Sequence, residues 1–271
     1  MKVGVLQNKV AIVTGGSSGI GRASALAMAR EGAYVVIADI NEAGAASAVA
    51  EIKAAGGDGS ATTTDVSEPA QLERLVRETV RRCGRIDILD NNAADLSLLA
   101  VDGDLLETDI DVWEKTYRAN QQSVMAACKY ALPHMIKGGG GAIVNISSVD
   151  GLLGEVTRFA YGMSKAAINL LTLCIATTYG KQGVRCNAIL PGLVMTPMAI
   201  ENIGEAEREI WQSNIPTPHF GKTEEIASVV VFLASDAASY VNGELIRVDG
   251  GLLSHVPHMA QQRLLDAKNR R

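Results

Sequence analysis

The pair of side chains with the clearest potential for chemistry is Tyr161 and Lys165, which stand four residues apart. They lie in the proline-free run 157–180, which reads as a helix, so this spacing places both on one face, one turn apart. An ammonium beside a phenol stabilises the phenolate, so we expect Lys165 to lower the pKa of Tyr161 from its ordinary value of about 10. The pair predicts a proton-transfer group near neutral pH, although the spacing alone is more typical of surface pairs.

The same run also predicts which face of its helix is buried. Apolar residues recur in it at helical spacing, so we expect them to pack against the core of the protein. The residues expected on the buried face are Met163, Ala167, Leu170, Leu171, Cys174 and Ile175.

A glycine-rich turn is the second chemical feature. The largely β-branched run 10–14 reads as a strand, four glycines fall between residues 15 and 21, and a helical pattern continues to about residue 31. Glycines let the backbone approach an anion closely, and the free N–H groups at the helix start face that anion with the positive end of the helix dipole. We therefore predict a phosphate-binding loop at Thr14-Gly15-Gly16-Ser17-Ser18-Gly19-Ile20-Gly21.

Asp39 follows the second predicted strand, residues 34–38. A carboxylate at this place can accept hydrogen bonds from the ribose hydroxyls of NAD, and it repels the 2′-phosphate of NADP. Neither lysine nor arginine occurs at 16–20 or 40–42 to attract that phosphate, although Arg22 is near. The sequence therefore favours NAD over NADP as cofactor.

Strands and helices alternate along almost the whole chain. These elements must position the tyrosine–lysine pair, the glycine-rich turn and Asp39. The predicted strands are 10–14, 34–38, 60–65, 86–89, 142–146, 185–190 and 244–248, and the predicted helices are 19–31, 42–55, 69–83, 109–137, 157–180, 198–213 and 223–234. This alternation, without repeat or linker, predicts a single α/β domain with a doubly wound, Rossmann-type parallel sheet of about seven strands flanked by helices.

Polar residues follow several of the predicted strands. The carboxyl ends of parallel strands share one edge of the sheet, where open α/β folds bind ligands. The residues at these strand ends are Asp39, Asp65, Asn91, Ser148 and Pro191-Gly192. We therefore expect the site along this edge.

Composition narrows the class of protein. Of the 271 residues, 47% are hydrophobic and 4% aromatic, which suits an aliphatic core, and the net charge of -5 argues against nucleic-acid binding. The four cysteines form no Cys-x-x-Cys pair and the four histidines lack metal-ligand spacing, so we expect reduced thiols and no metal site. The start of the chain lacks a signal-peptide core, and no run of about 18 apolar residues predicts a membrane span, so we expect a cytoplasmic protein.

Taken in order, these motifs resemble the short-chain dehydrogenase/reductase family over residues 7–252. Asn91-Asn92-Ala93-Ala94 is similar to the Asn-Asn-Ala-Gly motif of that family, with Ala94 in place of the glycine. The residues that match its catalytic tetrad are Asn120, Ser148, Tyr161 and Lys165. Ser148 rather than Ser147 is assigned because the serine of the family lies thirteen residues before its tyrosine.

The resemblance implies an NAD-dependent oxidoreductase that interconverts a secondary alcohol and a ketone, and a homotetramer. In the family pattern Tyr161 transfers the hydroxyl proton, while Lys165 lowers its pKa and holds the nicotinamide ribose. Ser148 stabilises charge on the substrate oxygen, and Asn120 positions a water. The residues implied for cofactor binding are Gly15, Ser17, Ser18, Gly19, Ile20, Gly21, Asp39, Asp65, Val66, Asn92, Ala93, Tyr161, Lys165, Pro191, Gly192, Val194 and Thr196.

The expected substrate pocket is mostly aliphatic, which suits a hydrophobic or cyclic small molecule. Its expected lining is Leu96, Leu152, Leu153, Glu155, Val156, Leu193 and Met198. Each aliphatic residue could equally belong to the core, and Glu155 could be a solvated loop carboxylate. Residues 253–271 are expected to form a C-terminal tail that packs on a neighbouring subunit or covers the site.

Two other functions stay open on the sequence. One is an NADPH-dependent ketoreductase, such as a 3-oxoacyl-carrier reductase, against which Asp39 argues. The other is a non-catalytic dinucleotide-binding protein on the same fold, against which the complete tetrad argues. A comparison of NAD with NADP decides the first alternative, and turnover of any secondary alcohol decides the second.

Overall fold

The computed structural model describes residues 4–269. At its centre lies one sheet of seven strands in the order β3-β2-β1-β4-β5-β6-β7, and every neighbouring pair is parallel. The strands are β1 (Val10–Thr14), β2 (Tyr34–Asp39), β3 (Asp58–Thr63), β4 (Ile88–Asn91), β5 (Gly141–Ile146), β6 (Val184–Pro191) and β7 (Leu245–Val248). The strand order reverses between β1 and β4, and open α/β sheets bind ligands at such a switch point.

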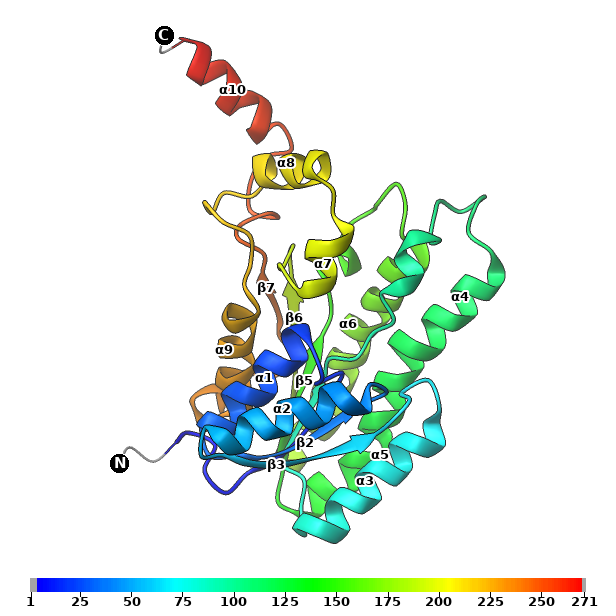
Figure 1. The fold of residues 1–271 in the computed structure, drawn as a ribbon, viewed down its shortest axis with the longest axis vertical. Helices are drawn as coiled ribbons and strands as arrows, with labels where there is room; N and C mark the ends of the chain where they lie inside the picture. The colour runs from blue at the N-terminus through cyan, green and yellow to red at the C-terminus, as the bar shows by residue number, and fades with distance from the viewer. Residues whose placement is uncertain (1–3, 270–271) are drawn as a thin grey trace.

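Helices cover both faces of this sheet (Figure 1). They are α1 (Gly19–Arg30), α2 (Glu42–Ala54), α3 (Pro69–Cys83), α4 (Ile110–Thr116), α5 (Ser123–Lys137), α6 (Phe159–Tyr179), α7 (Pro197–Asn202), α8 (Glu205–Asn214), α9 (Thr223–Ala234) and α10 (Met259–Asn269). Ala11 and Val13 of β1 pack with α1, α2 and α9, whereas Ile12 packs on the opposite face with α3, α5 and α6. The predicted doubly wound, single-domain fold is confirmed.

Two strands near the expected site are displaced from their predicted positions. β3 starts at Asp58 rather than residue 60, and β4 spans 88–91 rather than 86–89. Asp90 and Asn91 therefore belong to β4 itself instead of to the loop after it. The single helix predicted for 198–213 is two helices, α7 and α8, because the chain leaves helical geometry at Ile203-Gly204.

The long helix predicted for 109–137 changes type in its middle. α4 and α5 are joined without interruption by a π-helical segment, Tyr117–Gln122. A π segment widens the helix locally and is frequent at functional sites. Asn120 lies in this segment and is fully buried.

The buried face of α6 differs from the predicted one. Of the predicted residues Ile175 alone is buried, whereas Met163 and Leu170 are 62% and 63% exposed. The residues that face the core are Ala160, Ser164, Lys165, Ile168, Asn169, Thr172, Ile175 and Ala176. The prediction was wrong because this face carries polar groups of the site, so apolar periodicity selected the outer face.

By length and composition alone, the stretch Phe159–Gln182 could also cross a membrane, but it packs against β6 and the π segment as a core helix. Near the chain end, α10 contacts α8 and projects away from the sheet (Figure 1). It falls within the predicted tail 253–271, of which residues 270–271 lie outside the described residues.

Candidate active site

Tyr161 and Lys165 come together near the carboxyl end of β5. The Nζ of Lys165 lies 5.5 Å from the centroid of the Tyr161 ring and donates a hydrogen bond of 2.9 Å to the carbonyl oxygen of Ile146, the last residue of β5. Lys165 is buried, whereas Tyr161 is partly exposed. The helical spacing therefore predicted the contact, and the end of β5 fixes the lysine.

The two serines after β5 have different partners. The Ser147 hydroxyl donates to the carbonyl oxygen of Lys165 at 3.1 Å, so it faces the backbone of α6. The Ser148 hydroxyl accepts a hydrogen bond of 3.1 Å from the N–H of Asp150, and it lies near enough to the Tyr161 phenol to lower the pKa of that group. Ser148 rather than Ser147 therefore lies beside the phenol. Ser148 is the serine that the thirteen-residue spacing to Tyr161 selected.

Asp150 is a charged group of this site that sequence reasoning missed. The residue is 9% exposed, and burial raises the pKa of its carboxyl, with repulsion by Glu155 in the same direction. Its negative charge raises the pKa of both Tyr161 and Lys165. The only signal in the sequence is a carboxylate two residues after Ser148, and nothing there shows that the short turn after β5 buries it.

Desolvation is the largest influence on the pKa of both side chains, although part of the Tyr161 residue stays exposed. Loss of hydration raises the pKa of Tyr161 well above its ordinary value, with Asp150 adding to the shift and Ser148 and Arg158 opposing it. Loss of hydration lowers the pKa of Lys165 to about 8, against the attraction of Asp150. The predicted lowering of the Tyr161 pKa by Lys165 is therefore wrong for the protein by itself, because the desolvation of the phenol outweighs any help from the neighbouring ammonium.

Asn120 lies in the π segment, which packs against α6. Its Oδ1 accepts a hydrogen bond of 2.8 Å from the N–H of Asp95, while its buried Nδ2 has no hydrogen-bond partner within residues 4–269. An unsatisfied buried amide costs about 1–3 kcal/mol, so such a group is a candidate for binding a ligand or water. The sequence placed this asparagine in a helix but did not predict the π geometry.

The glycine loop depends on close backbone approach. Gly15 has a φ of +68°, and a Cβ there would lie 2.8 Å from the Cα of Ala93, while a Cβ on Gly21 would clash with the carbonyl oxygen of Gly15. The Nδ2 of Asn92 donates to the carbonyls of Thr14 and Gly15 at 3.2 and 3.1 Å. The Thr14 hydroxyl accepts from the N–H groups of Asn92 and Ala93. The segment after β4 is therefore hydrogen-bonded to the start of the glycine loop.

Asp39 ties the end of β2 to the same loop. One of its carboxylate oxygens accepts a hydrogen bond of 2.9 Å from the N–H of Ser17, and the other accepts one of 2.9 Å from the N–H of Asn41. The residue is 9% exposed. It therefore places a negative charge at the rim of the glycine loop.

The loop after β6 lies next to the glycine loop. A Cβ on Gly19 would meet the side chain of Thr196 at 3.3 Å, and Thr196 itself caps α7 by accepting from the N–H of Ala199. Asp65 lies two residues beyond β3 and accepts hydrogen bonds from Ser67. The other predicted cofactor residues lie along this edge of the sheet or in the first turn of α1: Ser18, Ile20, Val66, Pro191, Gly192 and Val194.

The predicted substrate-pocket residues are distributed over three loops around this edge. Leu152, Leu153 and Val156 follow the strand-end serines and are exposed, and Met198 on α7 is also exposed. Leu96 and Leu193 are partly buried, and Glu155 is exposed. The exposed aliphatic residues are not core residues, so the alternative interpretation given for them is wrong.

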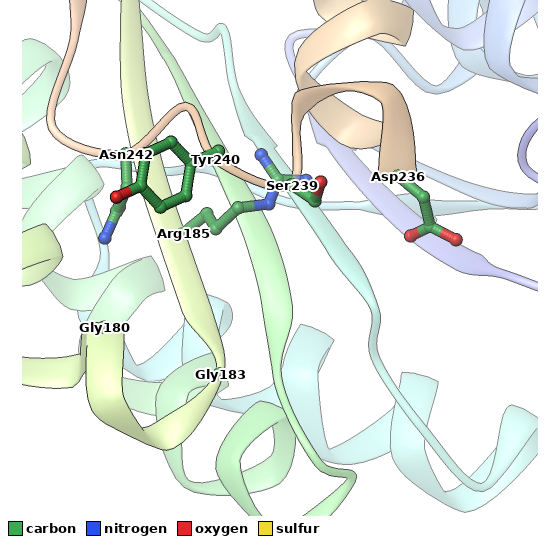
Figure 2. Close-up of a pocket in the computed structure, with 7 residues that line it drawn as sticks. All are labelled: Gly180, Gly183, Arg185, Asp236, Ser239, Tyr240 and Asn242. Atoms are coloured by element: carbon green, nitrogen blue, oxygen red, sulfur yellow. The ribbon is translucent and has the colours of Figure 1, made fainter.

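A surface cavity lies away from this edge, beside the amino ends of β6 and β7 (Figure 2). Its lining residues are Gly180, Gly183, Arg185, Asp236, Ser239, Tyr240 and Asn242. β6 runs from Val184 to Pro191, so this cavity and the serine-bearing edge lie at opposite ends of the sheet. The cavity contains none of the predicted site residues.

Known proteins match this chain over most of its length. Residues 15–253 match the family model described as enoyl-(acyl carrier protein) reductase. The 7alpha-hydroxysteroid dehydrogenase of Clostridium sardiniense is 40% identical over 256 residues, which are 94% of this chain and 97% of that protein. The chain belongs to the short-chain dehydrogenase/reductase family.

Other members of the short-chain dehydrogenase/reductase family are nearly as similar. The 3-oxoacyl-[acyl-carrier-protein] reductase of Thermotoga maritima is 38% identical over 248 residues, which are 92% of this chain and 99% of that protein. A solved 7 alpha-hydroxysteroid dehydrogenase, complexed with NADH and 7-oxo glycochenodeoxycholic acid, superimposes with a TM-score of 0.87 at 31% identity over 91% of this chain and 94% of that chain. The resemblance read from the motifs is confirmed, and the protein is a member of an oxidoreductase family.

Proposed function

We propose that this protein is an NAD-dependent dehydrogenase that interconverts a secondary alcohol and a ketone. The observation that carries the proposal is the meeting of Tyr161, Lys165 and Ser148 near the end of β5, with a glycine loop along the same edge of the sheet. A phenol, an ammonium and a hydroxyl in one place suit proton transfer to or from an oxygen.

The residues at the glycine loop fit a dinucleotide. A Cβ at Gly15 or Gly21 would come too close to neighbouring backbone atoms, so the tight turn requires glycine at both positions. The N–H groups at the start of α1 suit a pyrophosphate. Gly15 to Gly21 would hold the pyrophosphate, Asp39 the adenosine ribose, and Asp65 with Val66 the adenine. Bound there, NAD supplies the hydride acceptor and, when reduced, the hydride donor.

The preference for NAD over NADP rests on two charged side chains. The Asp39 carboxylate at the end of β2 would repel a 2′-phosphate. Arg22, the nearby cation that could attract this phosphate, is bound to Glu51 at 2.9 Å, and it donates to the carbonyl oxygens of Ser17 and Gly44. The guanidinium is therefore already occupied within the protein.

Each residue of the tetrad has a defined role in the proposed reaction. Tyr161 gives its phenolic proton to the ketone oxygen, or accepts the alcohol proton in the reverse direction. Ser148 donates a hydrogen bond to the same oxygen and stabilises the charge that develops there. Lys165 would bind the nicotinamide ribose through Nζ, and the unpartnered Nδ2 of Asn120 would hold a water that exchanges protons with solvent.

The substrate we propose is a hydrophobic or cyclic small molecule. Apolar surface for such a substrate lies beside the serine-bearing edge, on the exposed side chains of Leu152, Leu153 and Met198. A relative with 40% identity is named for action on a hydroxysteroid, which is a large cyclic secondary alcohol. Glu155 is the exposed charge in this segment and would meet a polar group of the substrate.

A second candidate function is reduction of a 3-oxoacyl carrier substrate with NADPH. The observation in its favour is the 38% identity to a 3-oxoacyl-[acyl-carrier-protein] reductase over 92% of this chain. The arrangement of Asp39 and of the Arg22–Glu51 ion pair argues for NAD instead.

The proposal is tested with the purified protein and a panel of cyclic, aromatic and steroid-like secondary alcohols. Formation of reduced cofactor is followed by absorbance, with NAD and NADP in parallel reactions. We expect turnover of at least one alcohol, with kcat/KM for NAD at least about tenfold above that for NADP. Preference for NADP together with reduction of an acyl-carrier ketone would support the second candidate, and no turnover in either direction would contradict both.

We further propose a homotetramer. The outer face of α6 presents exposed Met163, Leu170 and Leu173, which form a stripe of apolar side chains on a helix that is otherwise part of the core. Apolar surface of this kind favours association with a second copy of the chain.

A further inference from the structure

Asp102 is a buried acid on the segment between β4 and α4. Only 3% of its surface is exposed, although no cation pairs with it in the described chain. Its partners are three backbone N–H groups at the start of α6. One carboxylate oxygen accepts from Ala160 at 3.1 Å, the other accepts from Tyr161 at 2.8 Å, and its carbonyl oxygen accepts from Arg158 at 2.8 Å.

The start of α6 needs this support because it supplies no cap of its own. The first N–H groups of a helix have no partner within the helix, and a local Ser, Thr, Asp or Asn normally satisfies one of them. Arg158 stands at the cap position in a left-handed conformation, with a φ of 64°, and its side chain makes no capping bond. The first turn of α6 also lacks an acidic residue. Asp102 supplies both the acceptors and the negative charge that favour a helix N-terminus.

One of these bonds ends on the backbone of Tyr161 itself. A shift at this amide would move the phenol relative to Ser148 and to Lys165, which is fixed separately by the carbonyl of Ile146. The same segment also reaches Asn120, because the N–H of Asp95 donates to its side-chain oxygen at 2.8 Å. The segment after β4 is therefore hydrogen-bonded to two of the four residues matched to the tetrad.

We propose that Asp102 is a positioning residue: its carboxylate fixes the first turn of α6 and thereby holds the Tyr161 phenol in place for proton transfer. The expected effect of Asp102 on turnover rests on the proposed function. The expected effect of Asp102 on the start of α6 does not depend on it. Misplacement of a reacting group by about 1 Å costs on the order of a hundredfold in rate, so a small movement of the turn is enough to matter.

Asp104 offers a matched control in the same segment. Its carboxylate also accepts two backbone hydrogen bonds, from the N–H groups of Leu106 and Glu107 at 2.8 and 3.0 Å, but these belong to its own loop. Asp104→Ala therefore removes the same charge and the same kind of bond without touching α6. Asp102→Asn is the second test variant, because an amide retains one acceptor oxygen for the two N–H groups and should fold even if Asp102→Ala does not.

Amide hydrogen exchange, measured by mass spectrometry on the peptide 158–165, tests the helix directly. We expect exchange in Asp102→Ala to be about fivefold faster or more than in the wild type, with Asp102→Asn between them and Asp104→Ala unchanged. Wild-type exchange in both Asp102 variants would overturn the inference. This measurement needs no substrate, so it decides the role of Asp102 at the helix even if the proposed function fails.

Kinetics with an alcohol from the panel test the consequence for Tyr161. We expect kcat of the Asp102 variants to fall about tenfold or more, with KM for NAD within about twofold of the wild type, because the glycine loop is held by other residues. Asp104→Ala should keep both constants. A merely structural role would lower the unfolding temperature but leave kcat unchanged below it, and that result would overturn the positioning role. Absence of turnover in the wild type would count against the proposed function alone.

Discussion

Desolvation acts in opposite directions on the two reactive side chains of α6. It raises the pKa of Tyr161 and lowers the pKa of Lys165 to about 8, because burial disfavours the charged form of an acid and of a base alike. At neutral pH the phenol is therefore protonated, which suits it to give a proton to a ketone. For the proposed alcohol oxidation, the phenol must first lose this proton.

The pH dependence of the two directions follows from this state. Below its raised pKa, the fraction of Tyr161 present as phenolate grows about tenfold for each unit of pH, so the kcat/KM for alcohol oxidation should rise across the range from about 7 to about 9. The kcat/KM for ketone reduction should not rise in parallel, because it uses the protonated phenol. Initial rates in both directions over this range check the sign. An oxidation rate that stays flat or falls would contradict it.

Elements with regular local signals were predictable, and those shaped by distant contacts were not. The strand at residues 10–14 and the helices at 69–83 and 223–234 lie where apolar spacing and Pro69 placed them. The π segment around Asn120, which packs against α6, had no such signal. The start of α6 was equally hidden, because the cap comes from a residue in a different loop.

The same limit applies to the candidate site. The spacing of residues predicted Tyr161, Lys165 and the glycine loop, because the arrangement of each depends on residues close together in the sequence. It could not show the charge of Asp150 or the direction of the Tyr161 pKa, because both depend on burial. The exposed outer face of α6 misled the periodicity argument for a related reason: Met163 and Leu170 are apolar but do not face the core.

Asp90, which lies in β4, should make the free energy of unfolding depend on pH. It is fully buried, its two carboxyl oxygens have no hydrogen-bond partner within residues 4–269, and burial raises its pKa from 3.8 to about 8. The folded protein therefore holds a proton that the unfolded chain releases between these two values. The free energy of unfolding should fall as the pH rises through this window and then level off.

The variant Asp90→Asn tests this origin. A neutral amide of the same shape does not titrate, so the variant should lose this part of the pH dependence and gain stability relative to the wild type as the pH rises from about 5 to about 8. Urea unfolding of both proteins at these two pH values measures the difference. An identical change in the free energy of unfolding for both proteins would show that Asp90 is not responsible.

At the scale of the whole molecule, apolar side chains are left uncovered on the outer face of α6. Leu170 lies on this face and is 63% exposed, so an aspartate in its place would put a charge into the proposed subunit contact. We expect light scattering to give the mass of four chains for the wild type and a smaller mass for Leu170→Asp. Leu106, which is 93% exposed in the loop before α4, is a matched position where the same substitution should leave the mass unchanged. A wild-type mass of one chain would contradict the homotetramer.

The most direct test of the proposed mechanism is the substitution Tyr161→Phe, which removes the phenolic oxygen and retains the ring. We expect kcat with the best alcohol of the panel to fall by about a thousandfold or more, while the Kd for NAD from calorimetric titration stays within about twofold of the wild type. Tyr240→Phe is the control, because Tyr240 is fully exposed beside the cavity at the opposite end of the sheet (Figure 2). A Tyr161→Phe protein with wild-type kcat would contradict the assignment of this phenol as the proton-transfer group.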